Sequence, residues 1–97
     1  MEREPMKTPE SFEKQAIKKY LDGIGAWHFS PSMNGFGKAG VPDIIACING
    51  RFFGFEVKRE GAKPTVLQER RMRDIRFASG RTFWGTADKI IRELKDL

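Results

Sequence analysis

The sequence contains few of the residues that build disulfide frameworks or membrane segments. One cysteine among 97 residues allows no internal disulfide and no cysteine-rich zinc site. The longest uninterrupted apolar run has five residues, Ile44 to Ile48, and cannot cross a membrane. The amino-terminal residues are polar and charged, unlike a secretory signal. We therefore expect a protein of a reducing compartment with no membrane segment.

Length and charge narrow the class of protein. A chain of 97 residues predicts a single domain over residues 1–97, with residues 1–7 as a flexible tail. Its 18 Lys and Arg exceed its 13 Asp and Glu, which gives a net charge of +5. Residues 59–81 carry seven bases and three acids and hold most of this excess. Such a segment is typical either of a nucleic-acid-binding surface or of a solvated helix face.

Apolar periodicity and turn residues predict seven elements in the order αβββαβα. Thr8 and Pro9 are typical of a helix start, and Gly23 and Gly25 of its end. The other predicted elements are strands over residues 26–30, 42–48, 51–58 and 81–84, a helix over 65–78 and a last helix after Thr86. This order indicates an α/β fold, a small mixed sheet flanked by helices.

The dipeptide Asn49-Gly50 is a strong signal for a two-residue hairpin turn. Counted outward from this turn, Asp43 faces Glu56 across the two strands, and Lys58 points to the same face of the sheet. Two carboxylates at this spacing repel each other unless a cation lies between them. One interpretation is a site for a hard divalent cation with Lys58 beside it. The other is a loop-end Asp43 and a surface ion pair of Glu56 with Lys58.

Two further polar side chains fall on apolar helix faces. Glu13 lies within the apolar arc of the first helix, where a carboxylate needs a partner. Three alternatives fit this position: Glu13 forms a buried ion pair, the helix begins elsewhere than predicted so that Glu13 is not on the apolar face, or Glu13 faces the same metal site. Gln68 lies within the inward arc of the second long helix, but Thr65 and Gln68 also match a capping box. The two roles of Gln68 are compatible.

In order along the chain, these residues resemble the motifs of the PD-(D/E)xK nuclease superfamily, and more narrowly of its virus-type replication-repair (VRR-NUC) family. The resemblance rests on Glu13, on Gly40-Val-Pro-Asp-Ile-Ile, on Glu56-Val57-Lys58 with the residues before it, and on Lys63-Pro-Thr-x-x-Gln68. It covers about Phe12 to Trp84. It implies a restriction-endonuclease-like core and a metal-dependent DNA endonuclease.

The resemblance also implies a role for each matching residue. Asp43, Glu56 and the Val57 carbonyl would hold Mg²⁺ or Mn²⁺, and Glu13 would support this metal site. Lys58 would position the attacking water, and Gln68 would orient a site group or the scissile phosphate. The short chain is similar to the standalone phage and bacterial members. These are expected to be cytoplasmic homodimers that cut branched DNA, especially four-way (Holliday) junctions, in processes such as DNA repair.

Five basic residues are the expected DNA contacts. Lys38 belongs to a glycine-bearing loop over residues 31–40, which is otherwise a plain connector, and Phe36 of that loop is a second candidate contact. The others are Lys63, Arg70, Arg73 and Arg76. Cys47 is expected to be a small buried residue. The remaining aromatic residues Trp27, Phe29 and Trp84 are expected in the core or in a dimer interface.

Two other functions fit parts of the sequence. A non-catalytic basic module that binds nucleic acid would use residues 59–81, but it gains nothing from acids that face phosphate. A sequence-specific nuclease of the restriction type would need a segment that reads bases, and a chain this short contains no evident insertion of that kind.

Overall fold

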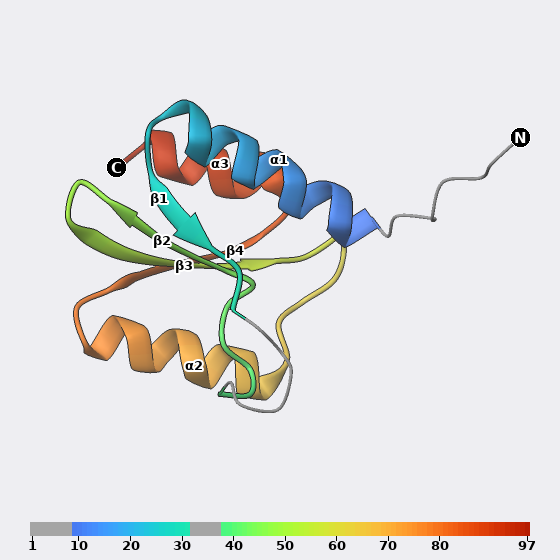
Figure 1. The fold of residues 1–97 in the computed structure, drawn as a ribbon. Coiled ribbons are helices and arrows are strands. Elements are labelled where there is room, and N and C mark those ends of the chain that lie inside the picture. Colours follow the sequence, from blue (N-terminus) through green and yellow to red (C-terminus); the bar gives the residue numbers. More distant parts are fainter. Residues whose placement is uncertain (1–8, 32–37) are drawn as a thin grey trace, which may run out of the picture.

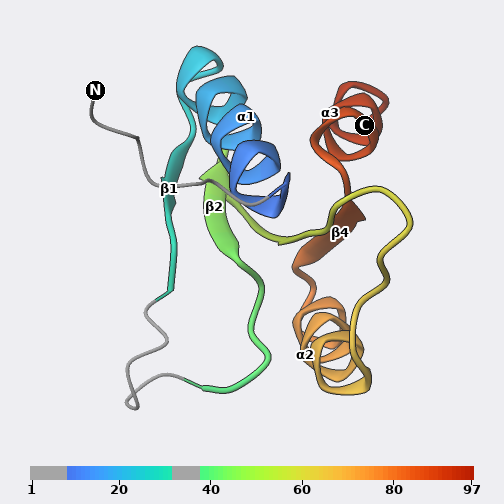
Figure 2. The ribbon, with the colours of Figure 1, turned by 90° about the vertical axis from the view of Figure 1, so that its right-hand side faces the viewer.

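The computed structural model describes residues 9–31 and 38–97, which form a mixed sheet between two helical layers. Helices α1 (Pro9–Gly23) and α3 (Ala87–Lys95) cover one face of the sheet, and α2 (Val66–Phe77) covers part of the other (Figures 1 and 2). Residues 1–7, Thr8 and Phe36, for which the sequence made predictions, lie outside the described residues. None of the described helices is long and apolar enough to span a bilayer.

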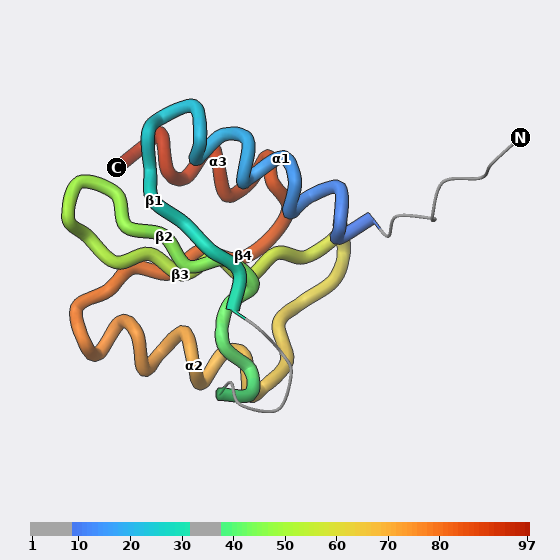
Figure 3. Tube along the Cα trace, viewed as in Figure 1, coloured from blue at the N-terminus to red at the C-terminus, as the bar shows by residue number. Residues whose placement is uncertain are grey.

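The four described strands are β1 (Trp27–Phe29), β2 (Ile44–Ile48), β3 (Arg51–Val57) and β4 (Arg81–Gly85). They lie side by side in this order, with antiparallel pairing of β1 with β2 and of β2 with β3. Strand β4 is parallel to β3, because the chain crosses over through α2 before it returns to the sheet (Figure 3). The predicted α/β class and element order αβββαβα are confirmed.

The turn of the β2–β3 hairpin has the geometry that its residues favour. Asn49 and Gly50 have φ angles of 52° and 80°, as a two-residue type I′ turn requires. The predicted register is confirmed, with Ile48 opposite Arg51 and Ile45 opposite Gly54. The ladder ends at Ile44 opposite Phe55, so Asp43 lies one residue beyond it. The next residue on the partner strand is Glu56.

The main core lies between the sheet and the α1–α3 layer. Ile17 and Leu21 of α1 and Ile90 of α3 are completely buried there. The rings of Phe53, Phe55 and Phe83 stack on the same side at centroid distances of 6.0 to 6.1 Å. Alternation along β3 therefore turns Glu56 toward the other face, where α2 packs.

The prediction that Cys47 is buried is wrong, because this residue is exposed. Trp27 and Phe29 are 65% and 45% exposed, so neither belongs to the core, and their alternative place in a dimer interface stays a prediction. The reason for this exposure is the placement of α2, which packs against β3 and β4 and leaves this face of β1 without a helix (Figure 2). Helical periodicity cannot reveal how far a helix extends across a sheet.

The close packing of β3 against the Pro42 ring predicts that Gly54→Ala destabilises the fold. A methyl group at Gly54 would lie 2.9 Å from Cγ of Pro42 and 3.2 Å from Cδ1 of Ile75. Overpacking of this kind costs about 1–3 kcal/mol. Urea unfolding followed by circular dichroism measures the loss. Gly23→Ala is the matched control because no atom lies within 4 Å of its added methyl group. Equal stability of the two variants would contradict this packing.

Candidate active site

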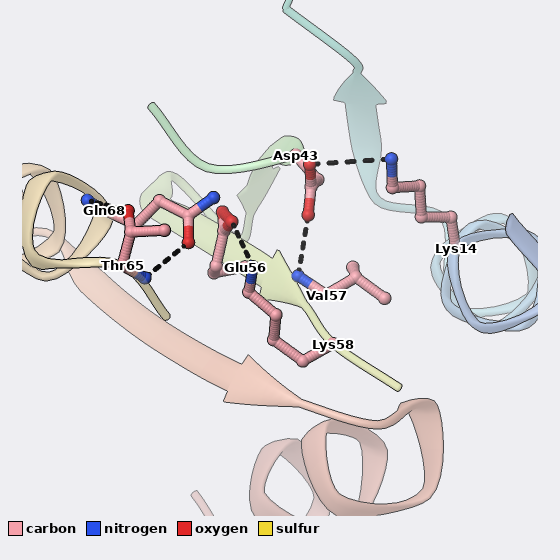
Figure 4. Close-up of polar contacts among 7 residues, drawn as sticks. All are labelled: Lys14, Asp43, Glu56, Val57, Lys58, Thr65 and Gln68. Carbon is pink, nitrogen blue, oxygen red and sulfur yellow. Dashed lines mark hydrogen bonds and ion pairs between the residues drawn. The ribbon is translucent and has the colours of Figure 1, made fainter. Parts of the chain in front are cut away.

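Polar side chains from three parts of the chain meet where β3 ends. The Nζ atom of Lys58 lies 3.8 Å from Oε1 of Glu56. Asp43, from the segment before β2, lies beside them, and Gln68 approaches from the start of α2 (Figure 4). The structure thus brings together Asp43, Glu56, Lys58 and Gln68, four of the residues that the sequence singled out.

Asp43 is fixed by two contacts. Its Oδ2 accepts a hydrogen bond of 2.9 Å from the backbone N–H of Val57, and its Oδ1 lies 3.6 Å from Nζ of Lys14 (Figure 4). The β2–β3 ladder ends before Val57, so the N–H of Val57 has no backbone acceptor on β2. The Asp43 carboxylate serves as the acceptor instead. Lys14 comes from α1, and the sequence analysis did not single it out. No local signal marks Lys14, because its place beside Asp43 depends on the packing of α1 over the sheet.

Glu56 is the buried polar residue of the site, with 1% of its surface exposed. Its Oε2 atom has no hydrogen-bond partner among the described residues. Burial, and after it the charge of Asp43, raises the pKa of Glu56 from 4.5 to about 7, and the nearby Lys58 and Lys14 limit the rise. A carboxylate in this position gains free energy from any additional positive charge that reaches it.

Gln68 has the dual placement that the sequence allowed. Its backbone N–H donates to Oγ1 of Thr65 at 3.1 Å, and its Oε1 accepts from the Thr65 N–H at 2.8 Å. The capping box is therefore confirmed. Oε1 is engaged in the cap, and Figure 4 shows the amide nitrogen at the other side of the group turned toward the Glu56 carboxylate. This nitrogen can donate a hydrogen bond into the site.

Glu13 lies apart from the other two acids. Its Oε1 accepts a hydrogen bond of 2.8 Å from the N–H of Ala87, the first residue of α3. A carboxylate at a helix amino terminus is stabilised by the helix dipole and by the unpaired N–H groups there. Among the described residues, no group of three or more acidic, histidine or cysteine side chains could hold a metal. In this structure α1 presents Lys14, not Glu13, to Asp43.

The expected DNA contacts are exposed. Arg70, Arg73 and Arg76 project from α2 and line one cavity, and Lys63 lines a second cavity in the segment between β3 and α2. Lys38 is exposed beside the part of the chain that is not described. The nearby Arg71 has a structural role instead, because its Nε donates to the Ala39 carbonyl at 2.9 Å.

The donor set fits a hard divalent cation. Mg²⁺ and Mn²⁺ prefer carboxylate, carbonyl and water oxygens. Asp43 and Glu56 supply two carboxylates, and the Oε2 atom of Glu56 is buried with no partner in residues 9–31 and 38–97. A cation would neutralise the two acids and satisfy this oxygen.

The architecture and this cluster together define a small α/β domain with a mixed sheet and a cluster of two acids and a lysine at the end of β3. No family profile matches the chain, and no curated protein is similar to it at a significant level. Among solved structures, the chain is similar to one described as a VRR_NUC domain, with a TM-score of 0.79 and 24% sequence identity. The match covers 93% of this chain and 97% of that one. The chain therefore has the fold of a VRR_NUC domain, as the sequence resemblance implied.

The raised pKa of Glu56 predicts a pH-dependent stability of the metal-free protein. The unfolded chain releases this proton near pH 4.5, whereas the folded chain holds it until about pH 7. The contribution of Glu56 to stability is thus complete below pH 4.5 and is lost as the pH rises through 7. The loss is on the order of 3 kcal/mol. In EDTA, Glu56→Gln should become more stable relative to the wild type between pH 5 and about pH 8.

Urea unfolding of both proteins at each pH measures this difference. Glu60→Gln is the control, because that carboxylate is exposed in the folded protein. A constant difference between wild type and Glu56→Gln across this range would contradict the burial of an ionisable Glu56.

Proposed function

We propose that this protein is a metal-dependent endonuclease that hydrolyses phosphodiester bonds in DNA. The observation that carries the proposal is the buried Glu56 carboxylate, with one unpartnered oxygen, between Asp43 and Lys58. A structural role does not require such a group, because an apolar residue would fill the position at a lower free energy. The VRR_NUC fold supports the same interpretation.

Asp43, Glu56 and the carbonyl of Val57 are the proposed holders of Mg²⁺ or Mn²⁺. When bound, the cation supplies positive charge against the phosphate and activates water as a nucleophile. The Asp43 carboxylate is already held in place by the Val57 N–H and by Lys14, so little reorganisation accompanies binding. Glu13 contributes indirectly, since its contact with Ala87 joins α3 to α1, the helix that carries Lys14.

Lys58 and Gln68 are the proposed polar partners of the reacting groups. The Lys58 ammonium, held beside Glu56, orients the attacking water and stabilises negative charge on the phosphate. The amide nitrogen of Gln68 donates to a phosphate oxygen. The water oxygen bonds to phosphorus as the water gives up a proton to solvent, the bond to the leaving sugar oxygen breaks, and the leaving oxygen takes up a proton from solvent.

DNA reaches this site along a basic surface. Arg70, Arg73 and Arg76 are exposed on α2, whose first turn carries Gln68, and Lys63 is exposed in the segment before it. Lys38 is exposed at the start of the described segment that leads into β2. The proposed substrate is branched DNA such as a four-way junction, and the proposed active form is a homodimer, whose two-fold symmetry would place two sites on two strands. Both follow from the resemblance to standalone VRR-NUC proteins, as does a place in the bacterial or phage-infected cytoplasm.

Removal of the Glu56 carboxylate should abolish cleavage while DNA binding survives. Glu56→Ala is expected to lower the cleavage rate by about 10²- to 10³-fold, and EDTA should have the same effect on the wild type. The measurement is cleavage of end-labelled DNA with Mg²⁺, Mn²⁺ or EDTA. Asp96→Asn, an exposed acid at the end of α3, is the control and should cut normally.

Wild-type rates in Glu56→Ala would contradict the proposed site. Salt-sensitive binding without cleavage under every metal condition would favour the non-catalytic binding module instead.

A four-way junction should be cut in preference to a linear duplex of matched sequence. Paired, symmetric nicks in the junction are expected from a dimer, and sedimentation of the protein with and without the junction measures its oligomeric state. Equal cleavage of both substrates would support the nuclease activity but contradict the proposed preference for branched DNA.

A further inference from the structure

Trp84 lies next to Glu56 across the sheet. The two residues are partners in the parallel pairing of β3 with β4, so their side chains point to the same face from strands about 4.8 Å apart. The Trp84 side chain is 36% exposed, although its neighbour Glu56 is buried. Strand β4 is at the edge of the described sheet, so this ring can be reached from solvent. Trp84 is therefore not a core residue, and its alternative place in a dimer interface stays a prediction.

Trp84 lines two cavities. One, of about 350 Å³, is formed with α2 and is lined by Val66, Glu69, Arg70, Met72, Arg73, Arg76 and Trp84. The other, of about 510 Å³, lies toward α3 and contains the cations Arg59, Lys63, Lys89 and Arg92 and the acids Glu60 and Asp88. In both cavities the basic residues outnumber the acidic ones. In proteins that bind single-stranded nucleic acid, a base stacks on an aromatic side chain while nearby cations bind the phosphates. Trp84 and the basic residues of these two cavities form a combination of this kind.

The ring is held in place by Lys89 of α3. The Nζ atom of Lys89 donates to the Trp84 carbonyl at 2.7 Å, lies 4.6 Å from the ring centroid and pairs with Oε1 of Glu93 at 3.0 Å. These contacts fix the strand and cover the ring on one side with a cation. A ring that is fixed in this way loses little conformational entropy when a ligand stacks on it.

Arg70 and Arg73 supply positive charge beside the ring. Both are exposed on α2, and their guanidinium groups have no hydrogen-bond or ion-pair partner within residues 9–31 and 38–97. Arg76, in contrast, donates to Oγ1 of Thr82 at 2.8 Å. The two unpaired guanidinium groups are therefore the ones available for phosphate oxygens.

We propose that Trp84, with Arg70 and Arg73, forms a subsite for an unstacked nucleotide next to the phosphate that is cleaved. The base stacks on the Trp84 ring in the cavity of about 350 Å³, and the two arginines hold its phosphates. A paired base inside a duplex has both faces covered by its neighbours and cannot stack on this ring. The substrate class is therefore DNA that offers an unpaired nucleotide at the cleavage position, such as a single-stranded flap or a branch point whose terminal base pair has opened.

This inference rests on the proposed function, and its first test uses cleavage. The substrates are a linear duplex and the same sequence with a single-stranded flap at the cleavage position. Trp84→Leu should lower kcat/KM on the flap about 5- to 100-fold, the effect of one stacked base, and should remove the preference for the flap. Trp84→Phe, which keeps an aromatic ring, should retain the preference. Trp27→Leu, at the exposed tryptophan of β1, is the matched control and should also retain it.

An equal loss on both substrates in Trp84→Leu, with normal unfolding by circular dichroism, would overturn the subsite. So would a Trp84→Phe variant that behaves like Trp84→Leu.

A second test does not require cleavage. The chain has two tryptophans, so Trp27→Phe leaves Trp84 as the single tryptophan fluorophore. In EDTA, the flap substrate should quench this fluorescence, and a flap with an abasic site at the first unpaired nucleotide should quench it much less. Quenching without any cleavage at any metal concentration would keep the subsite and overturn the nuclease. Cleavage with equal quenching by the intact and abasic flaps would keep the nuclease and overturn the subsite.

Discussion

The hydrogen bond from the Val57 N–H to the Asp43 carboxylate is the contact on which the site depends. It forms at the point where the β2–β3 ladder has ended, so a side chain takes over from the backbone as the partner of a buried N–H. Asp43 immediately precedes Ile44, the last paired residue of β2, and this hydrogen bond holds its side chain next to Glu56. A shift of one residue in the hairpin register would turn Glu56 into the phenylalanine core and separate the two acids.

The burial of Glu56 gives this arrangement its chemical character. Water is excluded from the carboxylate, Asp43 adds a like charge, and Lys58 and Lys14 only partly compensate, so the pKa of Glu56 rises to about 7. In the metal-free protein, ionisation of Glu56 is therefore unfavourable, and a cation bound between the two carboxylates would make it favourable. In a small domain with a limited core, a feature of this cost indicates selection for function more than for stability.

The elements around the sheet serve the site in different ways. Helix α1 supplies Lys14 to Asp43, while Glu13, one residue earlier, joins α1 to the start of α3. Helix α2 is started by the Thr65–Gln68 capping box, which also turns the Gln68 amide toward Glu56. The proposed subsite at Trp84 adds the edge strand to this set. Helices α1 and α2 and strand β3 therefore place side chains in or next to the cluster, and β4 places Trp84 beside Glu56.

The sequence by itself determined the seven elements, the hairpin register and the face shared by Asp43, Glu56 and Lys58. These follow from local rules, since turn residues set the register and alternation along a strand sets the face. Only the tertiary structure decided that Glu13 meets Ala87 while Lys14 meets Asp43, and that Trp84 lies beside Glu56. Neighbouring residues on one helix differ by about 100° in direction, so the packing angle of α1 chooses between them. The parallel return of β4 through α2 joins residues that no local pattern relates.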